Sequence, residues 1–280
     1  MRNFKFTLAY DGADFSGWQV QPQRPTVQGM LAAALERVTG RAVLPQGSGR
    51  TDAGVHALAQ VASCAMETPI PATNLRIALN DTLPAAIRVV DVEEVAPEFH
   101  ARHSARAKTY AYRIFRGEIC PPFLSRYVWR YPYPLDERAM FAAAAAVEGR
   151  HDFTSFAAVD PDRSGRDLDR EAGAVRTVLS SRWLRARSEL PLADIADTSM
   201  EREVAGVLDL MPSDQELVYV VRGEGFLHHM VRNLVGLFVL IGKGTVAPAQ
   251  IAEILAARSR AANPAATAPA SGLFLVNVDY

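Results

Sequence analysis

The alternation of polar and apolar positions in the first hundred residues predicts strands and helices in turn. From Phe4 to Tyr10, apolar side chains recur at every second position, which is the period of a half-buried strand. Thr26 can cap a helix whose apolar residues between Val27 and Val38 fall at helical spacing, and Gly40 ends it. The other expected elements are strands around residue 43, at 55–65 and at 87–95, and a helix at 71–80. The order β-α-β-β-α-β is that of the ferredoxin-like unit.

The second half of the chain repeats this order. Thr109–Phe115 alternates like a strand, an Ala-rich helix begins at Asp136 and ends near Val147, and Phe226–Lys243 is a strongly apolar helix. The remaining expected elements are strands at 175–184, 217–222 and 273–278 and a short helix at 248–257. We therefore expect an α+β protein of two ferredoxin-like halves, whose mainly antiparallel sheets meet at a central catalytic cleft.

These halves define two expected domains, residues 1–105 and residues 106–280. The second carries an acidic insertion at about 185–216, and residues 187–216 hold two Arg against eight acidic residues. Since about thirty residues exceed the usual length of a loop, we expect the insertion to be functional or mobile.

Composition narrows the class of protein. With 49% hydrophobic and 22% charged residues, the chain is expected to be globular rather than disordered. Its two cysteines, Cys64 and Cys120, form no CxxC, which argues against a zinc ribbon and suits a reducing compartment. The most apolar run, Leu234–Gly242, is far shorter than the roughly 20 residues that span a bilayer. The N-terminus alternates like a strand and has no signal-peptide pattern. We predict a cytoplasmic protein.

The distribution of charge matters more than its sum. The net charge is only −1, yet seven Lys and Arg residues stand against one Glu between His100 and Tyr131, interleaved with aromatic residues. Such a segment can contact phosphates and stack on bases. An ordinary solvated strand surface explains it about equally well on charge alone.

The segment Gly47–Ala57 is the most unusual in the chain. Three glycines surround the triplet Arg50-Thr51-Asp52 and allow a tight connection that displays a carboxylate. Judged by spacing alone, a turn Asp that bonds its own backbone is the commoner explanation. The segment lacks the GK[ST] ending of a phosphate-binding P-loop.

Two further segments carry residues with chemistry. Tyr110 and Tyr112 alternate on a predicted strand, where core packing is their usual role. His228 and His229 would lie about 100° apart on a helix and would not point at one metal. Arg232 stands among apolar neighbours, where an Arg normally needs a carboxylate partner.

Together these segments resemble the tRNA pseudouridine synthase A family, enzymes that modify uridines in the anticodon arm. The resemblance extends over nearly the whole chain, although the acidic insertion is longer than expected for the family. The matching residues are Tyr10-Asp11-Gly12, Phe15, Gly17-Trp18-Gln19, Thr26-Val27-Gln28, Gly49–Ala57, Phe99-His100-Ala101-Arg102, Lys108-Thr109-Tyr110, His151-Asp152-Phe153, Ser155-Phe156, Arg176-Thr177, Phe226, His229–Asn233 and Gly272-Leu273.

The resemblance implies an isomerase that turns uridine into pseudouridine in the anticodon stem-loop of tRNAs. It implies Asp52 as the nucleophile or base, Arg232 (with Arg50) as the cation that keeps it ionised, and Tyr110 as a stacking residue whose hydroxyl assists proton removal. It further implies no cofactor, no metal and no membrane, and a homodimer that binds tRNA. The residues expected to contact the substrate are Tyr110, Arg50, His56, Arg102, Lys108 and His229.

Two other classes of function remain open from the residues. One is a non-catalytic RNA-binding module with tandem sheets like those of RNA-recognition domains. The other is a metal-dependent hydrolase that uses Asp52, His56, His228 and His229. Asp52 in its Arg-Thr-Asp setting favours the isomerase over a simple RNA reader, and metal analysis would identify the hydrolase.

Overall fold

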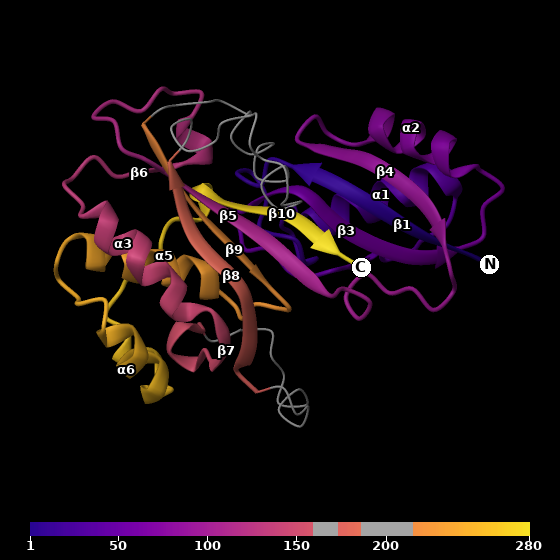
Figure 1. The fold of residues 1–280 in the computed structure, drawn as a ribbon. Coiled ribbons are helices and arrows are strands. Elements are labelled where there is room, and N and C mark those ends of the chain that lie inside the picture. Colours follow the sequence, from indigo (N-terminus) through magenta and orange to yellow (C-terminus); the bar gives the residue numbers. More distant parts are fainter. Residues whose placement is uncertain (159–172, 186–214) are drawn as a thin grey trace, which may run out of the picture. The chain divides into compact units, whose positions relative to one another are not determined.

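The computed structural model describes residues 1–158, 173–185 and 215–280, which form two compact units (Figure 1). The first unit contains residues 1–108 and 274–280, and the second contains residues 109–273. Both mix helices with mainly antiparallel strands, which confirms the predicted α+β class. Nearly all of the predicted acidic insertion lies outside the described residues. None of the helices in the described ranges is long and apolar enough to cross a membrane.

The first unit is built on a sheet in the order β4-β1-β3-β10, with β2 paired to β3. Strand β1 is antiparallel to both β3 and β4, and β10 is parallel to β3. Helices α1 and α2 contact each other, and α2 packs on β4. The elements are β1 (Arg2–Tyr10), α1 (Val27–Thr39), β2 (Gln46–Gly47), β3 (His56–Met66), α2 (Ala72–Thr82), β4 (Ile87–Val95) and β10 (Leu273–Asp279).

Strand β1 and helix α1 follow the sequence pattern closely. Phe4, Phe6 and Leu8 are fully buried, as their alternation predicts. The Thr26 side chain accepts a hydrogen bond from the backbone of Gly29, and Gly40 is left-handed at φ 69°, so both predicted ends of α1 are confirmed. The strand expected around residue 43 is instead the two-residue β2, which pairs with β3 at Ser63 and Ala62.

The second unit has its strands in the order β5-β9-β8-β7, with β6 parallel to β5. Strand β8 is antiparallel to β7 and to β9, and helices α3 and α5 pack on each other. The first two residues of β5 belong to the first unit. The elements are β5 (Ala107–Phe115), β6 (Trp129–Arg130), α3 (Glu137–Ala144), β7 (Gly149–Asp152), β8 (Val175–Arg185), β9 (Glu216–Gly223), α5 (Met230–Gly242) and α6 (Gln250–Ala257).

Two further observations differ from the sequence prediction. Helix α5 begins at Met230 instead of Phe226, because His229 adopts a left-handed backbone at φ 59° and interrupts the helical run. Strand β10 was assigned by sequence to the second half, but Phe274–Tyr280 make their contacts within the first unit, where Phe274 pairs with His56. The buried face of α5 forms the core of the second unit, where Phe238 packs on Trp183 and Tyr219.

Candidate active site

Asp52 lies in a turn between β2 and β3 whose backbone is held from two sides. The amide of Trp18 donates to the carbonyl of Thr51 (3.0 Å), and the amide of Val55 donates to the carbonyl of Asp52 (3.1 Å). Gly54 has φ 78°, a conformation that side chains other than glycine adopt only at a cost. Gly17 brings its backbone so close that a Cβ there would lie 2.6 Å from the carbonyl oxygen of Thr51. The turn is therefore locked at its backbone.

Buried side chains of β1 and β3 fix the residues on the N-terminal side of Asp52. The hydroxyl groups of Tyr10 and Thr51 are 2.8 Å apart. The amide group of Gln60 accepts from the Ser48 hydroxyl (2.7 Å) and donates to the carbonyl of Gly49 (3.0 Å). Burial raises the pKa of Tyr10 to about 12, so its hydroxyl stays protonated and neutral.

Sequence patterns did not identify three residues that support the turn, namely Tyr10, Ser48 and Gln60. One signal was present, because Gln60 is a polar residue inside an otherwise apolar strand and is fully buried. Phe15 and Trp18, which are buried beside the turn, were identified only through the resemblance.

The predicted binding residues of the first unit have different environments. The ammonium group of Lys108 donates to the carbonyl of Ser48 (2.6 Å), at the start of the Asp52 turn. Arg50 and Arg102 are exposed. His56 is only 1% exposed: its Nδ1 accepts from the amide of Gly12 (3.0 Å), and its ring stacks on Phe274 at 4.8 Å between centroids. This burial favours a core role for His56 over direct contact with RNA.

The second unit carries Tyr110 and Arg232. The ring of Tyr110, on β5, packs edge-on against Phe226, with centroids 5.1 Å apart. Arg232 lies in the first turn of α5, and its Nε donates to the carbonyl of Ala268 (2.7 Å). The three predicted catalytic residues are thus divided between the units, Asp52 in the first and Tyr110 and Arg232 in the second.

His228 and His229 lie outside helix α5, contrary to the sequence prediction. They form the turn before it, with ring centroids 4.0 Å apart. The two rings are therefore not directed apart as predicted, because the left-handed backbone of His229 brings them together.

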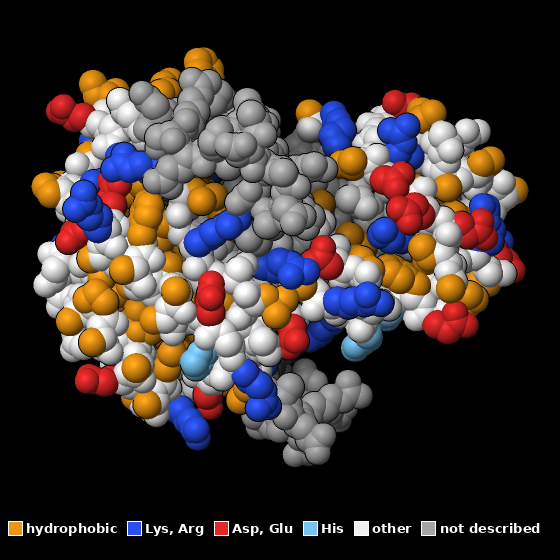
Figure 2. Space-filling model, in the orientation of Figure 1, with side chains coloured by type: hydrophobic (Ala, Val, Ile, Leu, Met, Phe, Trp, Pro, Cys, Tyr) orange, Lys and Arg blue, Asp and Glu red, His pale blue; other side chains and the backbone are white. Residues whose placement is uncertain are grey.

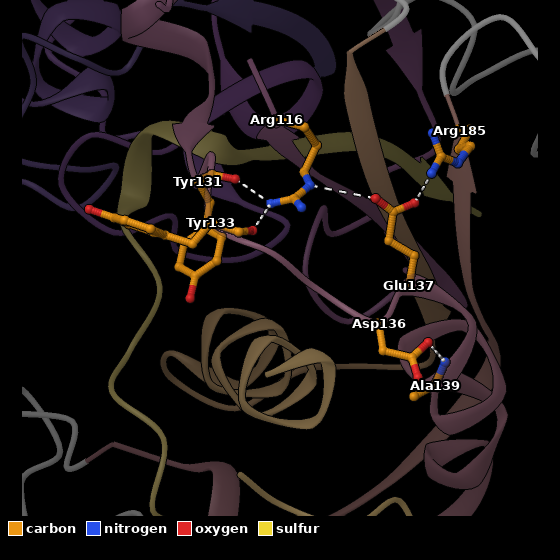
Figure 3. A network of polar contacts seen from close by, with 7 residues as sticks. All are labelled: Arg116, Tyr131, Tyr133, Asp136, Glu137, Ala139 and Arg185. Carbon is orange, nitrogen blue, oxygen red and sulfur yellow. Dashed lines mark hydrogen bonds and ion pairs between the residues drawn. The ribbon is translucent and has the colours of Figure 1, made fainter. Parts of the chain in front are cut away.

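The basic segment contributes less exposed charge than its composition suggests. Arg113 is fully buried and makes two hydrogen bonds to the carboxylate of Glu216, at 2.8 and 3.0 Å. Arg116 forms an ion pair with Glu137 (3.5 Å; Figure 3). On the face shown in Figure 2, basic and acidic side chains are interspersed. At least two of the seven cations therefore serve the fold, while Arg102 and Arg106 are exposed.

Comparison with known proteins matches most of this chain to one family. The family described as tRNA pseudouridine synthase matches residues 7–104 and 143–280, which include Asp52 and Arg232 but not Tyr110. A protein of Solibacter usitatus named "tRNA pseudouridine synthase A" is 48% identical over 280 residues, the whole of both chains. A protein of the same name from Moorella thermoacetica is 42% identical over 99% of this chain and 98% of its own length. Another from Brevibacillus brevis is 40% identical over the whole of both chains.

Proposed function

The chain belongs to the tRNA pseudouridine synthase family and is an isomerase that forms pseudouridine in tRNA, and we propose that Asp52 is its catalytic carboxylate and that anticodon-arm uridines are its targets. Membership of this family decides against the two other classes that the sequence left open, a non-catalytic RNA-binding module and a metal-dependent hydrolase.

The reaction needs a well-placed carboxylate. The N1–C1′ bond of uridine breaks, the base turns, and C5 joins C1′; C5 then loses its proton and N1 gains one, so the atoms balance with no oxidant or reductant. A carboxylate can attack the nucleoside as a nucleophile or remove a proton as a base, and both routes place it next to the ribose and the base. Asp52 is partly exposed and can meet such a substrate.

The locked backbone of the Asp52 turn is the observation that carries this proposal. A misplacement of about 1 Å can lower the rate of a catalysed step about 100-fold, so a catalytic side chain has to be supported by a rigid surrounding. The hydrogen bonds of Thr51, Ser48 and Gly49 to β1 and β3 support the N-terminal side of Asp52, and Gly17 closely approaches the backbone of both neighbours of Asp52, Thr51 and Ala53.

The remaining roles follow from the chemistry of the side chains. A guanidinium group beside a carboxylate favours its charged form, which is the role we propose for Arg232 with Arg50. The target uridine has to leave its stack, at a cost of a few kcal/mol, and stacking on Tyr110 would offset part of this cost. Lys108 and Arg102 of the first unit, and His229 of the second, are proposed RNA contacts.

The proposal is tested by Asp52→Asn, which removes the charge and keeps the shape. We expect no detectable pseudouridine in unmodified tRNA, while tRNA binding stays within a few-fold of the parent because no phosphate contact is lost. Asp91→Asn is the matched control, since Asp91 is an exposed carboxylate on β4 of the same unit. Normal turnover by Asp52→Asn would refute the assignment, and mapping the product sites along the anticodon arm tests the proposed target.

We propose the finer architecture and assembly on the same basis. The element order of the first unit, β1-α1-β2-β3-α2-β4, supports a ferredoxin-like half, and the second unit supplies β5, α3, β8, β9 and α5 in the corresponding order. A cytoplasmic homodimer is the form that we propose binds tRNA, because a dimer would offer the substrate a larger surface. Light scattering of the purified protein tests the dimer.

A further inference from the structure

A series of aromatic rings leads from the core of the second unit to its surface. Tyr112 is fully buried and meets Trp129 edge to face, with centroids 6.3 Å apart. Trp129 and Tyr131 are 5.2 Å apart, and Tyr131 and Tyr133 are 5.4 Å apart. The last ring, that of Tyr133, is 64% exposed. The series therefore ends in an aromatic ring that is supported on one side and open to solvent on the other.

The segment that carries these rings is held firmly in place. The guanidinium group of Arg116 donates to the carbonyl oxygens of Tyr131 and Tyr133, the latter at 2.8 Å, and lies 6.0 Å from the Tyr131 ring (Figure 3). Glu137 holds Arg116 from the other side and also contacts Arg185. A ligand that stacks on Tyr133 would therefore order little additional backbone, which favours binding.

A cation lies beside the exposed ring. Tyr131, Tyr133, Pro134 and Lys243 line a cavity of about 430 Å³, a volume in the range of ligand sites. Lys243 is exposed and follows the last residue of α5, and it forms no ion pair with any carboxylate in the described part of the chain.

One acidic residue near the cavity, Asp136, is already engaged by another group. The backbone amide of Asp136 donates to the carbonyl of Gly242, the residue before Lys243 (2.7 Å). Its carboxylate accepts from the amide of Ala139 (3.0 Å) and caps α3, where the positive end of the helix offsets its charge (Figure 3). The cavity thus combines an open aromatic face with a cation whose charge is available, the pair of features that bind a base and a phosphate of single-stranded nucleic acid.

We propose that the cavity of Tyr131, Tyr133, Pro134 and Lys243 binds one nucleotide of the tRNA substrate, with its base stacked on Tyr133 and a phosphate beside Lys243. The proposal rests on tRNA as the substrate and does not depend on the role of Asp52. The family match leaves out residues 105–142, which include three of the four lining residues, so it assigns them no role.

The test compares the binding of full-length unmodified tRNA by variants of the whole protein. Tyr133→Ala removes the stacking surface and is expected to raise the Kd about tenfold, the effect of one stacked base. Tyr133→Phe keeps the ring and is the matched control, expected to bind like the parent. Thermal melting of each variant shows that the fold is retained.

A second pair of variants tests the phosphate contact. Lys243→Gln is expected to weaken binding and to lower the slope of log Kd against log salt by about 0.7, the value for one phosphate contact on a single strand. Lys243→Arg keeps the charge and is expected to keep the slope.

The outcomes are separable from those of Asp52→Asn. Unchanged tRNA affinity of both Tyr133→Ala and Lys243→Gln would overturn the proposal. Equal weakening by Tyr133→Ala and Tyr133→Phe would also overturn it, because the hydroxyl and not the ring would then matter. A change in oligomeric state with unchanged tRNA affinity would make this surface a contact between two copies of the chain, which contradicts a nucleotide site. If Asp52→Asn stays active, the catalytic assignment fails while the prediction for Tyr133 stands.

Discussion

Gln60 offers the sharpest test of whether the support of the Asp52 turn matters for catalysis. Its side chain is fully buried on β3 and joins two groups of the turn, the hydroxyl of Ser48 and the carbonyl of Gly49. Gln60→Leu keeps a similar volume but can neither accept from the one nor donate to the other. The substitution therefore loosens the turn without touching Asp52.

The magnitude follows from the groups left behind. A buried polar group that loses its partner costs about 1 to 3 kcal/mol, so the two groups together cost about 2 to 6 kcal/mol, and the added apolar burial of Leu offsets part of this cost. We expect the free energy of unfolding to fall by about 2 to 4 kcal/mol. If the turn shifts Asp52 by a fraction of an ångström, kcat should fall about 10- to 100-fold.

A control in the same unit separates the two effects. The side chain of Asn80 also makes two hydrogen bonds to backbone, donating to the carbonyl of Val89 (2.8 Å) and accepting from its amide (2.9 Å). Asn80→Leu removes as many bonds and should also lower the free energy of unfolding, by a smaller amount because Asn80 is only partly buried. It does not involve the Asp52 turn, so kcat should be unchanged.

The assay combines urea unfolding with the release of tritium from C5 of uridine in tRNA, since that hydrogen leaves during isomerisation. Both variants are measured at saturating tRNA and at a temperature at which each is fully folded. The reasoning is refuted if Gln60→Leu retains the parent kcat, or if Asn80→Leu loses as much activity as Gln60→Leu.

Two further predictions concern stability. Hydrogen bonds from Thr154 hold the pKa of Asp152 below its usual range, so the native state gains stability above the ordinary carboxyl pKa and loses it as the pH falls through the lower pKa of the folded state. Urea unfolding of Asp152→Asn should lack this acid-dependent loss, and a loss equal to that of the parent would contradict the assignment. Arg113 and Glu216 form a buried ion pair, so Glu216→Gln should lower the free energy of unfolding by about 3 to 5 kcal/mol because it leaves the buried charge of Arg113 unpaired. The double variant Arg113→Met, Glu216→Leu should recover most of this loss. A double variant as unstable as the single one would show that the pair is favourable in itself.

The sequence predicted the elements whose signals are local. The alternation from Phe4 to Leu8 and the two caps of α1 depend on neighbouring residues, and the structure has them as expected. Helix α5 begins later than its apolar pattern predicted, because nothing in that pattern marks the left-handed backbone of His229.

Sequence patterns could not predict contacts between residues that lie far apart along the chain. Arg113 was counted as a surface cation, and its partner Glu216 lies a hundred residues away, so no spacing rule could join them. Asp52 itself was ambiguous from spacing, and the role proposed for it came from the resemblance. The side chains that hold its turn, above all Gln60, are visible only once β1 and β3 are paired.

The return of β10 to the first unit has a consequence for synthesis. Phe274 stacks on His56, which accepts a hydrogen bond from the amide of Gly12. The part of the sheet that follows the Asp52 turn is therefore completed by residues that are synthesised only after the entire second unit. A nascent chain of only the first 108 residues contains Asp52 but lacks β10, the strand that pairs with β3. The sheet of the first unit can therefore be completed only after the second unit has been synthesised.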